Sequence, residues 1–175
     1  MKNHSNDITT WRHLHILADH LETNVKPEDF YFPSYRAAKY SKDVSGRSAF
    51  FSVPYKGQDD CGTVGCALGN GPFVNHNKFK PILSDFGRNG LNWERYAERL
   101  FPHSKRSREM IFNDPIWIHM IHRKENNSIT ITIMVLILRQ CAEIIRTEHM
   151  TSPLIRDCIN KIKEQAKAGK LWRRE

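Results

Sequence analysis

The chain has 175 residues, of which 39% are hydrophobic, and its 27 Lys and Arg against 19 Asp and Glu give a net charge of +8. This composition excludes a disordered or low-complexity chain and predicts a single globular domain over residues 1–175. The longest strongly apolar run, residues 133–138, is far shorter than a membrane helix, and the polar start of the chain carries no apolar signal-peptide stretch. We therefore expect a cytoplasmic protein that does not contact membranes.

The first part of the chain predicts one helix and one short strand. Asp7 or Thr9 can cap a helix that runs to about Leu21, because apolar residues recur every three or four positions along it and form one face. Prolines interrupt residues 26–54, and within this irregular stretch the hydrophobic run 49–53 predicts a short strand.

A glycine-rich motif occupies nine residues with the sequence Cys-Gly-Thr-Val-Gly-Cys-Ala-Leu-Gly. Small residues allow close packing, Thr63 can cap a helix, and a glycine commonly follows the last helical residue. We therefore predict a short, closely packed helix over residues 63–68 that stops at Gly69. The residues interpreted as this structural motif are Cys61, Gly62, Thr63, Gly65, Cys66 and Gly69.

The second half of the chain predicts further helices. Asn92 can cap a helix that Pro102 closes, and residues 104–112 can add one or two helical turns. Residues 129–133 alternate as a strand does, but the length and composition of the apolar continuation favour a single helix over about 130–146.

A final helix is predicted from Ser152 to Gly169. Cys141 and Cys158 fall on the apolar faces of the last two helices, so we expect both thiols in the core. Together the elements predict a mainly α, compact single-domain helical fold with at most a short β-hairpin or strand near residues 48–54.

The motif and the order of the elements around it resemble a family of short, mostly uncharacterised phage, prophage and bacterial proteins. The shared features are an amphipathic N-terminal helix containing residues 14–21, a Phe- and Tyr-rich stretch with prolines at 27–33, the pattern C-G-T-x-G/A-C-A-x-G at 61–69, and an aromatic stretch before a closing helix. Here residues 70–72, Asn-Gly-Pro, follow the motif where the family carries a large and a small residue. The resemblance implies a phage or prophage accessory protein in the host cytoplasm, with counter-defence among its roles, and it implies no catalytic residue.

Basic residues concentrate toward the C-terminus. From residue 161 to the end six Lys and Arg stand against two acidic residues, so +4 of the net charge of +8 lies there. This asymmetry favours an anionic partner, with nucleic acid first and an acidic host protein or a small nucleotide next, although a solvated helix face explains the C-terminal cluster equally well. The candidate anion-binding residues are Lys161, Lys163, Lys167, Lys170, Trp172, Arg173 and Arg174 in the last helix and tail (152–175), and Lys105, Arg106 and Arg108 in the middle of the chain.

Cys61 is the candidate nucleophile of an alternative, enzymatic hypothesis. A helix N-terminus lowers the pKa of a nearby thiol, and the amides that follow can stabilise an oxyanion. Asp59 and Asp60 precede the cysteine and disfavour its thiolate. A cysteine-dependent hydrolase or transferase is therefore the alternative, and a non-enzymatic binding protein is the function we favour.

The sequence contains no complete metal-ligand pattern of the usual spacing. Structural zinc sites take four Cys or His ligands, with the first two commonly separated by two to four residues. We therefore expect no metal and no cofactor. The candidate groups, each short of a full ligand set, are Cys61-x4-Cys66, His119-x2-His122 and His13-x-His15-x4-His20.

Overall fold

The fold is mainly helical, as the sequence predicts. The computed structural model describes residues 3–26, 30, 37–39, 50–52, 63–64, 67–88, 90–112, 127–148 and 152–168. The α-helices of this part of the chain are α1 (Asn3–Asn24), α2 (Trp93–Leu100), α3 (Lys105–Phe112), α5 (Asn127–Glu148) and α6 (Ser152–Lys167). Its short 3-10 helices are η2 (Leu68–Phe73), η3 (Asn77–Phe79) and η4 (Leu83–Asp85).

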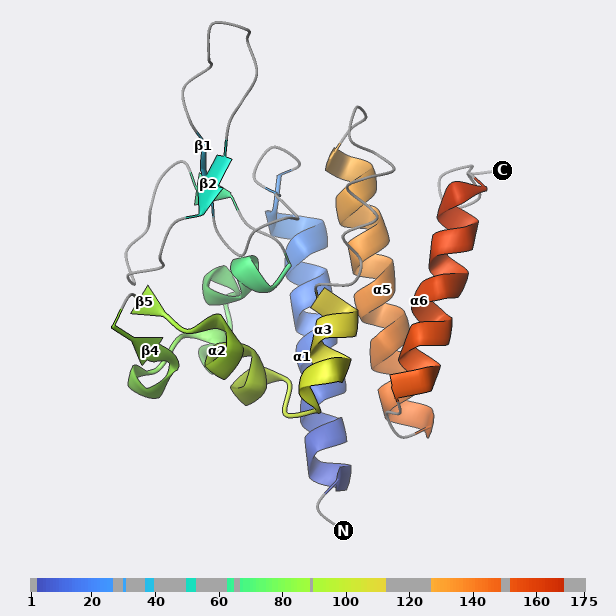
Figure 1. Ribbon diagram of the computed structural model, residues 1–175, viewed down its shortest axis with the longest axis horizontal. Helices are drawn as coiled ribbons and strands as arrows, with labels where there is room; N and C mark the ends of the chain where they lie inside the picture. The colour runs from blue at the N-terminus through green and yellow to red at the C-terminus, as the bar shows by residue number, and fades with distance from the viewer. Residues whose placement is uncertain are drawn as a thin grey trace, which may run out of the picture.

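The core lies between α1, α5 and α6. Helices α1 and α5 pack along each other, and α6 returns antiparallel beside α5 (Figure 1). Because consecutive residues of α5 are buried, this helix is covered on most of its sides and is the centre of the bundle. Within these three helices the completely buried side chains are Leu14, Leu17, Ala18 and Leu21 of α1, Ile133, Met134, Ile137, Leu138, Cys141 and Ala142 of α5, and Ile155 of α6.

The helices predicted over 7–21 and 130–146 are both present, and each extends further at both ends. The choice of helix over strand at 129–133 is therefore confirmed, because the whole stretch lies inside α5. The alternation of β-branched residues at 129–133 is short, whereas the apolar stretch that contains it is long enough for a helix. A helix that is apolar on most of its sides is buried among several neighbouring elements. On α1, Leu14 is fully buried as expected, whereas Trp11 packs against the core while only partly buried.

Local capping fixes the helices in the middle of the chain. Asn92 Oδ1 accepts a hydrogen bond from the backbone N–H of Arg95 at 3.1 Å, so the predicted N-cap of α2 is confirmed. Ser104 Oγ likewise accepts from the N–H of Ser107 at 3.2 Å and begins α3. The last helix, α6, begins at Ser152 as predicted and ends two residues before Gly169.

The helix predicted over residues 63–68 is wrong. Thr63 and Val64 form strand β3, which pairs antiparallel with Ala38 and Ala37. The predicted stop at Gly69 is also wrong, since this residue is buried inside η2. Pairing of two β-branched residues with a neighbouring strand outweighs local capping, and the Gly-, Asn- and Pro-rich residues of η2 take the short 3-10 form instead of an α-helix. The other motif residues, Cys61, Gly62, Gly65 and Cys66, lie outside the described residues.

Two small antiparallel strand groups complete the described structure. In the first, β1 (Ala37–Lys39) lies between β2 (Phe50–Ser52) and β3 (Thr63–Val64). Strand β2 falls within the stretch predicted from 49–53. In the second, β4 (Phe86–Gly87) pairs with β5 (Gly90–Leu91), and Gly90 has a positive φ of 103°, which a side chain would strain. This turn directs the chain back toward Asn92 and α2.

Candidate anion-binding cavity

A cavity of about 870 Å³ opens between the middle of α1, the segment around η3, and the C-terminal end of α2. Its cationic and imidazole side chains come from all three elements, so the cavity exists only when they pack together. No Asp or Glu belongs to its described lining. The lining residues are Thr9, Arg12, His13, Ile16, His76, Asn77, Lys78, Ile82 and Arg99.

Arg99 fixes one wall of the cavity. Its guanidinium donates to both carboxylate oxygens of Asp85, with Nη2 to Oδ2 at 2.7 Å, and it also donates to the backbone carbonyls of Lys78 at 2.7 Å and Lys80 at 3.1 Å. Asp85 is only 2% exposed and accepts a further hydrogen bond from the N–H of Ile82 at 2.9 Å. This network ties the segment from η3 to η4 onto α2 and compensates the charge of Arg99.

Arg12 and Lys78 are the lining residues whose positive charge no described carboxylate neutralises. Both side chains are exposed. Within the described residues, neither forms an ion pair with a carboxylate, whereas Arg99 has Asp85. The guanidinium of Arg12 lies 5.5 Å from the ring centroid of Trp11, which holds it beside the α1 surface. An anion entering the cavity therefore meets two cations, and no carboxylate among the described lining residues competes with it.

His13 forms the floor of the cavity and is 8% exposed. Its Nδ1 donates to the carbonyl oxygen of Leu100 at 2.6 Å, so the hydrogen-bond network places the proton of the neutral ring on Nδ1 and leaves Nε2 bare. The ring packs edge-on against Phe79 and lies 6.4 Å, between centroids, from His76. Burial lowers the pKa of His13, and the positive charges of His76, Arg99 and Lys78 lower it further, while the hydrogen bond to Leu100 opposes these effects.

His76 caps η3 and presents the opposite tautomer. Its Nδ1 accepts a hydrogen bond from the N–H of Lys78 at 3.3 Å, so the neutral ring carries its proton on Nε2. The exposed His76 ring is therefore a hydrogen-bond donor at the cavity even without a charge. Together with Arg12, Lys78 and the side-chain amide of Asn77, it provides donors for the oxygen atoms of an anion, while Ile16 and Ile82 provide apolar contact.

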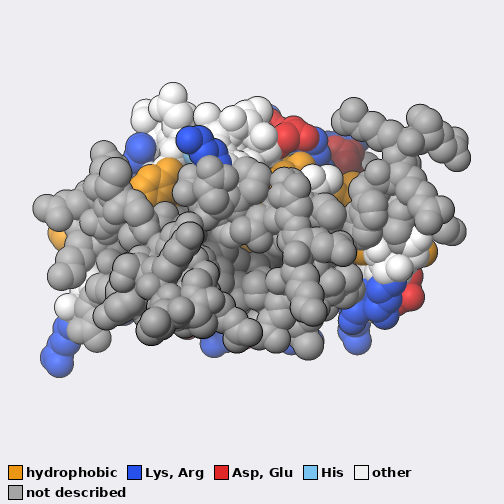
Figure 2. All heavy atoms as spheres, turned by 90° about the horizontal axis from the view of Figure 1, so that it is seen from above, with side chains coloured by type: hydrophobic (Ala, Val, Ile, Leu, Met, Phe, Trp, Pro, Cys, Tyr) orange, Lys and Arg blue, Asp and Glu red, His pale blue; other side chains and the backbone are white. Residues whose placement is uncertain are grey.

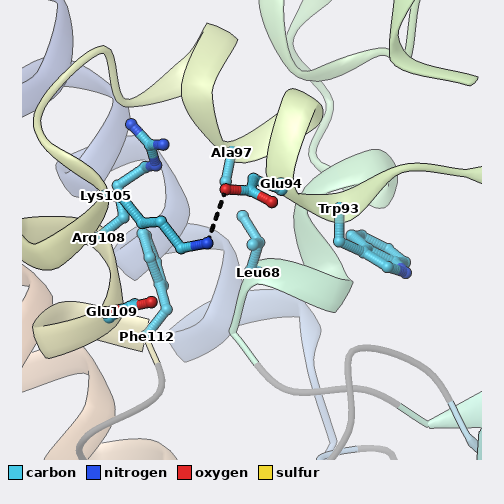
Figure 3. A pocket seen from close by; sticks show the side chains of 8 residues that line it. All are labelled: Leu68, Trp93, Glu94, Ala97, Lys105, Arg108, Glu109 and Phe112. Atoms are coloured by element: carbon cyan, nitrogen blue, oxygen red, sulfur yellow. Dashed lines mark ion pairs between the residues drawn. The ribbon is translucent and has the colours of Figure 1, made fainter.

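A second, smaller cavity of about 200 Å³ lies between α2, α3 and η2 (Figure 3). Lys105 and Glu94 point toward each other across it, with Nζ and Oε1 3.1 Å apart. Two basic and two acidic side chains line the cavity, so their charges balance. Its lining residues are Leu68, Trp93, Glu94, Ala97, Lys105, Arg108, Glu109 and Phe112.

The basic residues predicted as anion ligands on α3 are engaged in contacts within the protein. Lys105 pairs with Glu94, and Arg106 lies 3.8 Å from a carboxylate oxygen of Glu109. Arg108 is buried and donates to the carbonyl of His103. These side chains connect α2 and α3 or support α3 itself. Lys105 and Arg108 both line the second cavity, where two acidic side chains balance their charge, and Arg106 is not part of that lining.

Three of the C-terminal candidates, Lys161, Lys163 and Lys167, lie on α6, which is on the other side of the α1–α5 pair from α2 (Figure 1). Lys161 and Lys167 are exposed and Lys163 is half-buried, and Lys167 Nζ lies 2.9 Å from Glu164. The remaining candidates Lys170, Trp172, Arg173 and Arg174 lie outside the described residues. On the face drawn in Figure 2 the described Lys and Arg side chains are scattered, and red acidic side chains accompany some of them.

Sequence reasoning missed the cavity residues Arg12, His76, Lys78 and Arg99. They come from three separate stretches of the chain and form no motif, although the segment before α3 is locally basic through Lys78, Lys80, Arg88, Arg95 and Arg99. That excess was the available signal.

Three histidines of α1, namely His13, His15 and His20, do not form a shared site. His13 contacts the Leu100 carbonyl, whereas His15 Nε2 lies 3.3 Å from Glu143 on α5, and burial lowers the pKa of His20 with Lys80 nearby. Successive residues of a helix point about 100° apart, so His15 faces away from the other two. No group of three or more His, Cys, Asp or Glu in the described part of the chain could hold a metal ion. Cys61, His119 and His122 lie outside that part.

Comparison of the chain with family models, with curated proteins and with solved structures gave no match. Among the described helices, none has the length and hydropathy needed to cross a membrane.

Proposed function

We propose that this protein is a non-enzymatic binding protein for a phosphate-bearing partner, with nucleic acid as the first candidate, and that the cavity between α1, η3 and α2 receives the phosphate. One observation carries the proposal. Arg12, Lys78 and His76 present cationic or N–H groups to a cavity whose described lining contains no carboxylate. Phosphate oxygens are strong acceptors for these groups, and a water-filled cavity with one sign of charge concentrates anions.

The size and the apolar contacts of the cavity favour a nucleotide unit over a bare inorganic ion. A volume of about 870 Å³ is within the usual range of small-molecule sites. Ile82 on its wall is 48% exposed, and the next residue, Leu83, is 91% exposed, so apolar surface continues beside the charged groups. A sugar or base can cover this surface while its phosphate meets the cations. A single strand, whose bases are accessible, suits such a cavity better than a duplex.

The resemblance to phage and prophage proteins remains a hypothesis and suggests where such binding would be used. A phage accessory protein that holds nucleic acid, or a small nucleotide signal of the host, would act in the host cytoplasm and serve counter-defence. An acidic host protein is the next partner class. The enzymatic alternative at Cys61 remains a prediction, because that residue lies outside the described part of the chain.

The test is the salt dependence of binding to a fluorescently labelled single-stranded oligonucleotide, measured by anisotropy. Each phosphate contact contributes about 0.7 to the slope of log affinity against log salt for a single strand. Replacing both cations in Arg12→Gln/Lys78→Gln should therefore reduce the slope by about 1.4 and weaken binding. The matched control is Lys161→Gln/Lys167→Gln, which removes the same charge from α6.

The outcomes separate the hypotheses. An unchanged slope in the cavity variant and a reduced slope in the α6 variant would reject the cavity and favour the C-terminal helix as the nucleic-acid surface. Absence of binding to DNA and RNA in low salt would reject nucleic acid as the partner. In that case, binding of a free nucleotide measured by calorimetry, and its loss in the same cavity variant, would identify the smaller phosphorylated ligand.

A further inference from the structure

The hairpin of α5 and α6 brings two cysteines to the same level. Cys141 lies seven residues before Glu148, the last residue of α5, and Cys158 lies six residues after Ser152, the first residue of α6. At 1.5 Å per residue these positions are about 10 Å and about 9 Å from the turn. Because the two helices are antiparallel neighbours (Figure 1), both cysteines lie at a similar height along the helix pair.

The surroundings of the two thiols differ. Cys141 is completely buried, whereas Cys158 is partly exposed and packs against the edge of the core. The two thiols lie close enough for each to shift the pKa of the other. Cys158 is therefore the thiol that a small reagent can reach from solvent, whereas Cys141 is shielded from it.

The thiol that solvent reaches is also the one that ionises more easily. The hydrogen bond from Cys141 lowers the pKa of Cys158, and the nearby ammonium of Lys161 on the same helix adds to this, while partial burial opposes it. The hydrogen bond to Cys158 and complete burial raise the pKa of Cys141 well above its usual value. Of the two thiols, Cys158 is therefore the one that ionises more easily and attacks as a nucleophile more readily.

We propose that Cys141 and Cys158 form an oxidisable dithiol site whose substrate is a peroxide, with Cys158 as the reacting thiol and Cys141 as the resolving thiol. This site is separate from the anion-binding cavity and does not depend on the proposed function. The cysteines lie on α5 and α6, while the cavity residues lie on α1, the η3 segment and α2.

The chemistry proceeds in two steps with hydrogen peroxide as the oxidant. The thiolate sulfur of Cys158 attacks one peroxide oxygen, an S–O bond forms, the O–O bond breaks, and the departing hydroxide takes up a proton to become water. The sulfur of Cys141 then attacks the sulfenic sulfur of Cys158, an S–S bond forms, the S–O bond breaks, and the hydroxide leaves as water with the proton of Cys141. The two thiols lose two electrons and two protons in total, and the peroxide is reduced to two water molecules.

The experiment treats the reduced full-length protein with hydrogen peroxide, blocks the remaining thiols with an alkylating reagent, and maps the peptides by mass spectrometry. We expect a linked peptide pair that joins Cys141 to Cys158 and a mass lower by two hydrogen atoms. A Cys61→Ser/Cys66→Ser variant serves as the control and should give the same link, because those two residues take no part.

Single variants assign the two roles. In Cys141→Ala, Cys158 should accumulate as the sulfenic acid and be captured by dimedone, whereas in Cys158→Ala, Cys141 should remain unmodified. Both variants replace a thiol with a small apolar group, and far-UV circular dichroism verifies that they are folded. If Cys158 in the folded wild-type protein is oxidised no faster than Cys141 in Cys158→Ala, or if Cys158 passes to the sulfinic acid without forming the link, the proposal is wrong.

Discussion

Replacing Arg99 with methionine tests the ion pair that holds the wall of the cavity. In Arg99→Met, Asp85 stays 2% exposed but loses every contact from the guanidinium, and the carbonyls of Lys78 and Lys80 lose theirs as well. Breaking a buried pair by removing one partner costs about 3–5 kcal/mol. The remaining hydrogen bond from the N–H of Ile82 to Asp85 places the expected loss near the lower end, at about 3 kcal/mol.

The reciprocal change should cost less. In Asp85→Asn, Arg99 keeps the two backbone carbonyls and has a side chain that is 25% exposed, so water solvates part of its charge. We expect a loss of about 1–2 kcal/mol, because an amide still accepts hydrogen bonds from both Arg99 and Ile82. The two variants differ in the charge that is left unpaired. In Arg99→Met it is the buried carboxylate of Asp85, and in Asp85→Asn it is the partly exposed guanidinium of Arg99.

Urea denaturation followed by circular dichroism measures both losses as shifts in midpoint at constant slope. For a chain of this length, a loss of about 3 kcal/mol should also lower Tm by about 6–12 °C. The control is Arg95→Met on the exposed face of α2, which should change stability by less than about 0.5 kcal/mol. If Arg99→Met is no more destabilising than Asp85→Asn or than the control, a buried unpaired Asp85 is not the source of the cost.

Three further predictions follow from single contacts. Gly71→Ala should lower the free energy of unfolding by about 1–3 kcal/mol, because its new Cβ would lie 2.6 Å from the hydroxyl oxygen of the buried Tyr96. Thermal unfolding should show a smaller loss in a Tyr96→Phe background, and an equal loss there would contradict the clash. The pKa of His13 is lowered in the folded state, so the stability from its neutral form is present above pH 6.5 and declines as the pH falls below that value. The same protonation should strengthen binding of sulfate, whose own charge is constant in this range. His13→Gln should flatten both the Tm and the sulfate-affinity profiles, and profiles identical to wild type would exclude His13 as the titrating group. Asn92→Ala should cost about 1 kcal/mol by removing the N-cap of α2, measured by urea denaturation; a cost near zero would mean that water replaces the cap.

The helices were accessible from the sequence because their signals are local. The apolar repeat of α1 and the long apolar run of α5 lie within single helices, and the Asn92 cap acts over three residues. The helix predicted for the glycine-rich stretch was wrong because the structure of that stretch depends on distant residues. Thr63 and Val64 pair with residues more than twenty positions earlier in the chain, and no pattern within 61–69 contains that information.

The candidate sites show the same division. Net charge and its asymmetry indicated an anionic partner, and the spacing of the last helices placed Cys141 and Cys158 on apolar faces. The charge count could not show that Lys105 pairs with Glu94, or that Arg12 and Lys78 meet around a cavity whose described lining contains no carboxylate.

The sequence by itself determined the α-helices α1, α2, α5 and α6, their buried faces and the overall basic character, since each depends on residues within a few positions of one another or on composition alone. Only the tertiary structure decided which charges are neutralised and which converge. His13 of α1 meets the Leu100 carbonyl across 87 positions of the chain, and Arg139 of α5 meets Glu22 of α1 across 117. Such partners are set by how the helices pack, because electrostatic compensation depends on distance in space and not on separation along the chain.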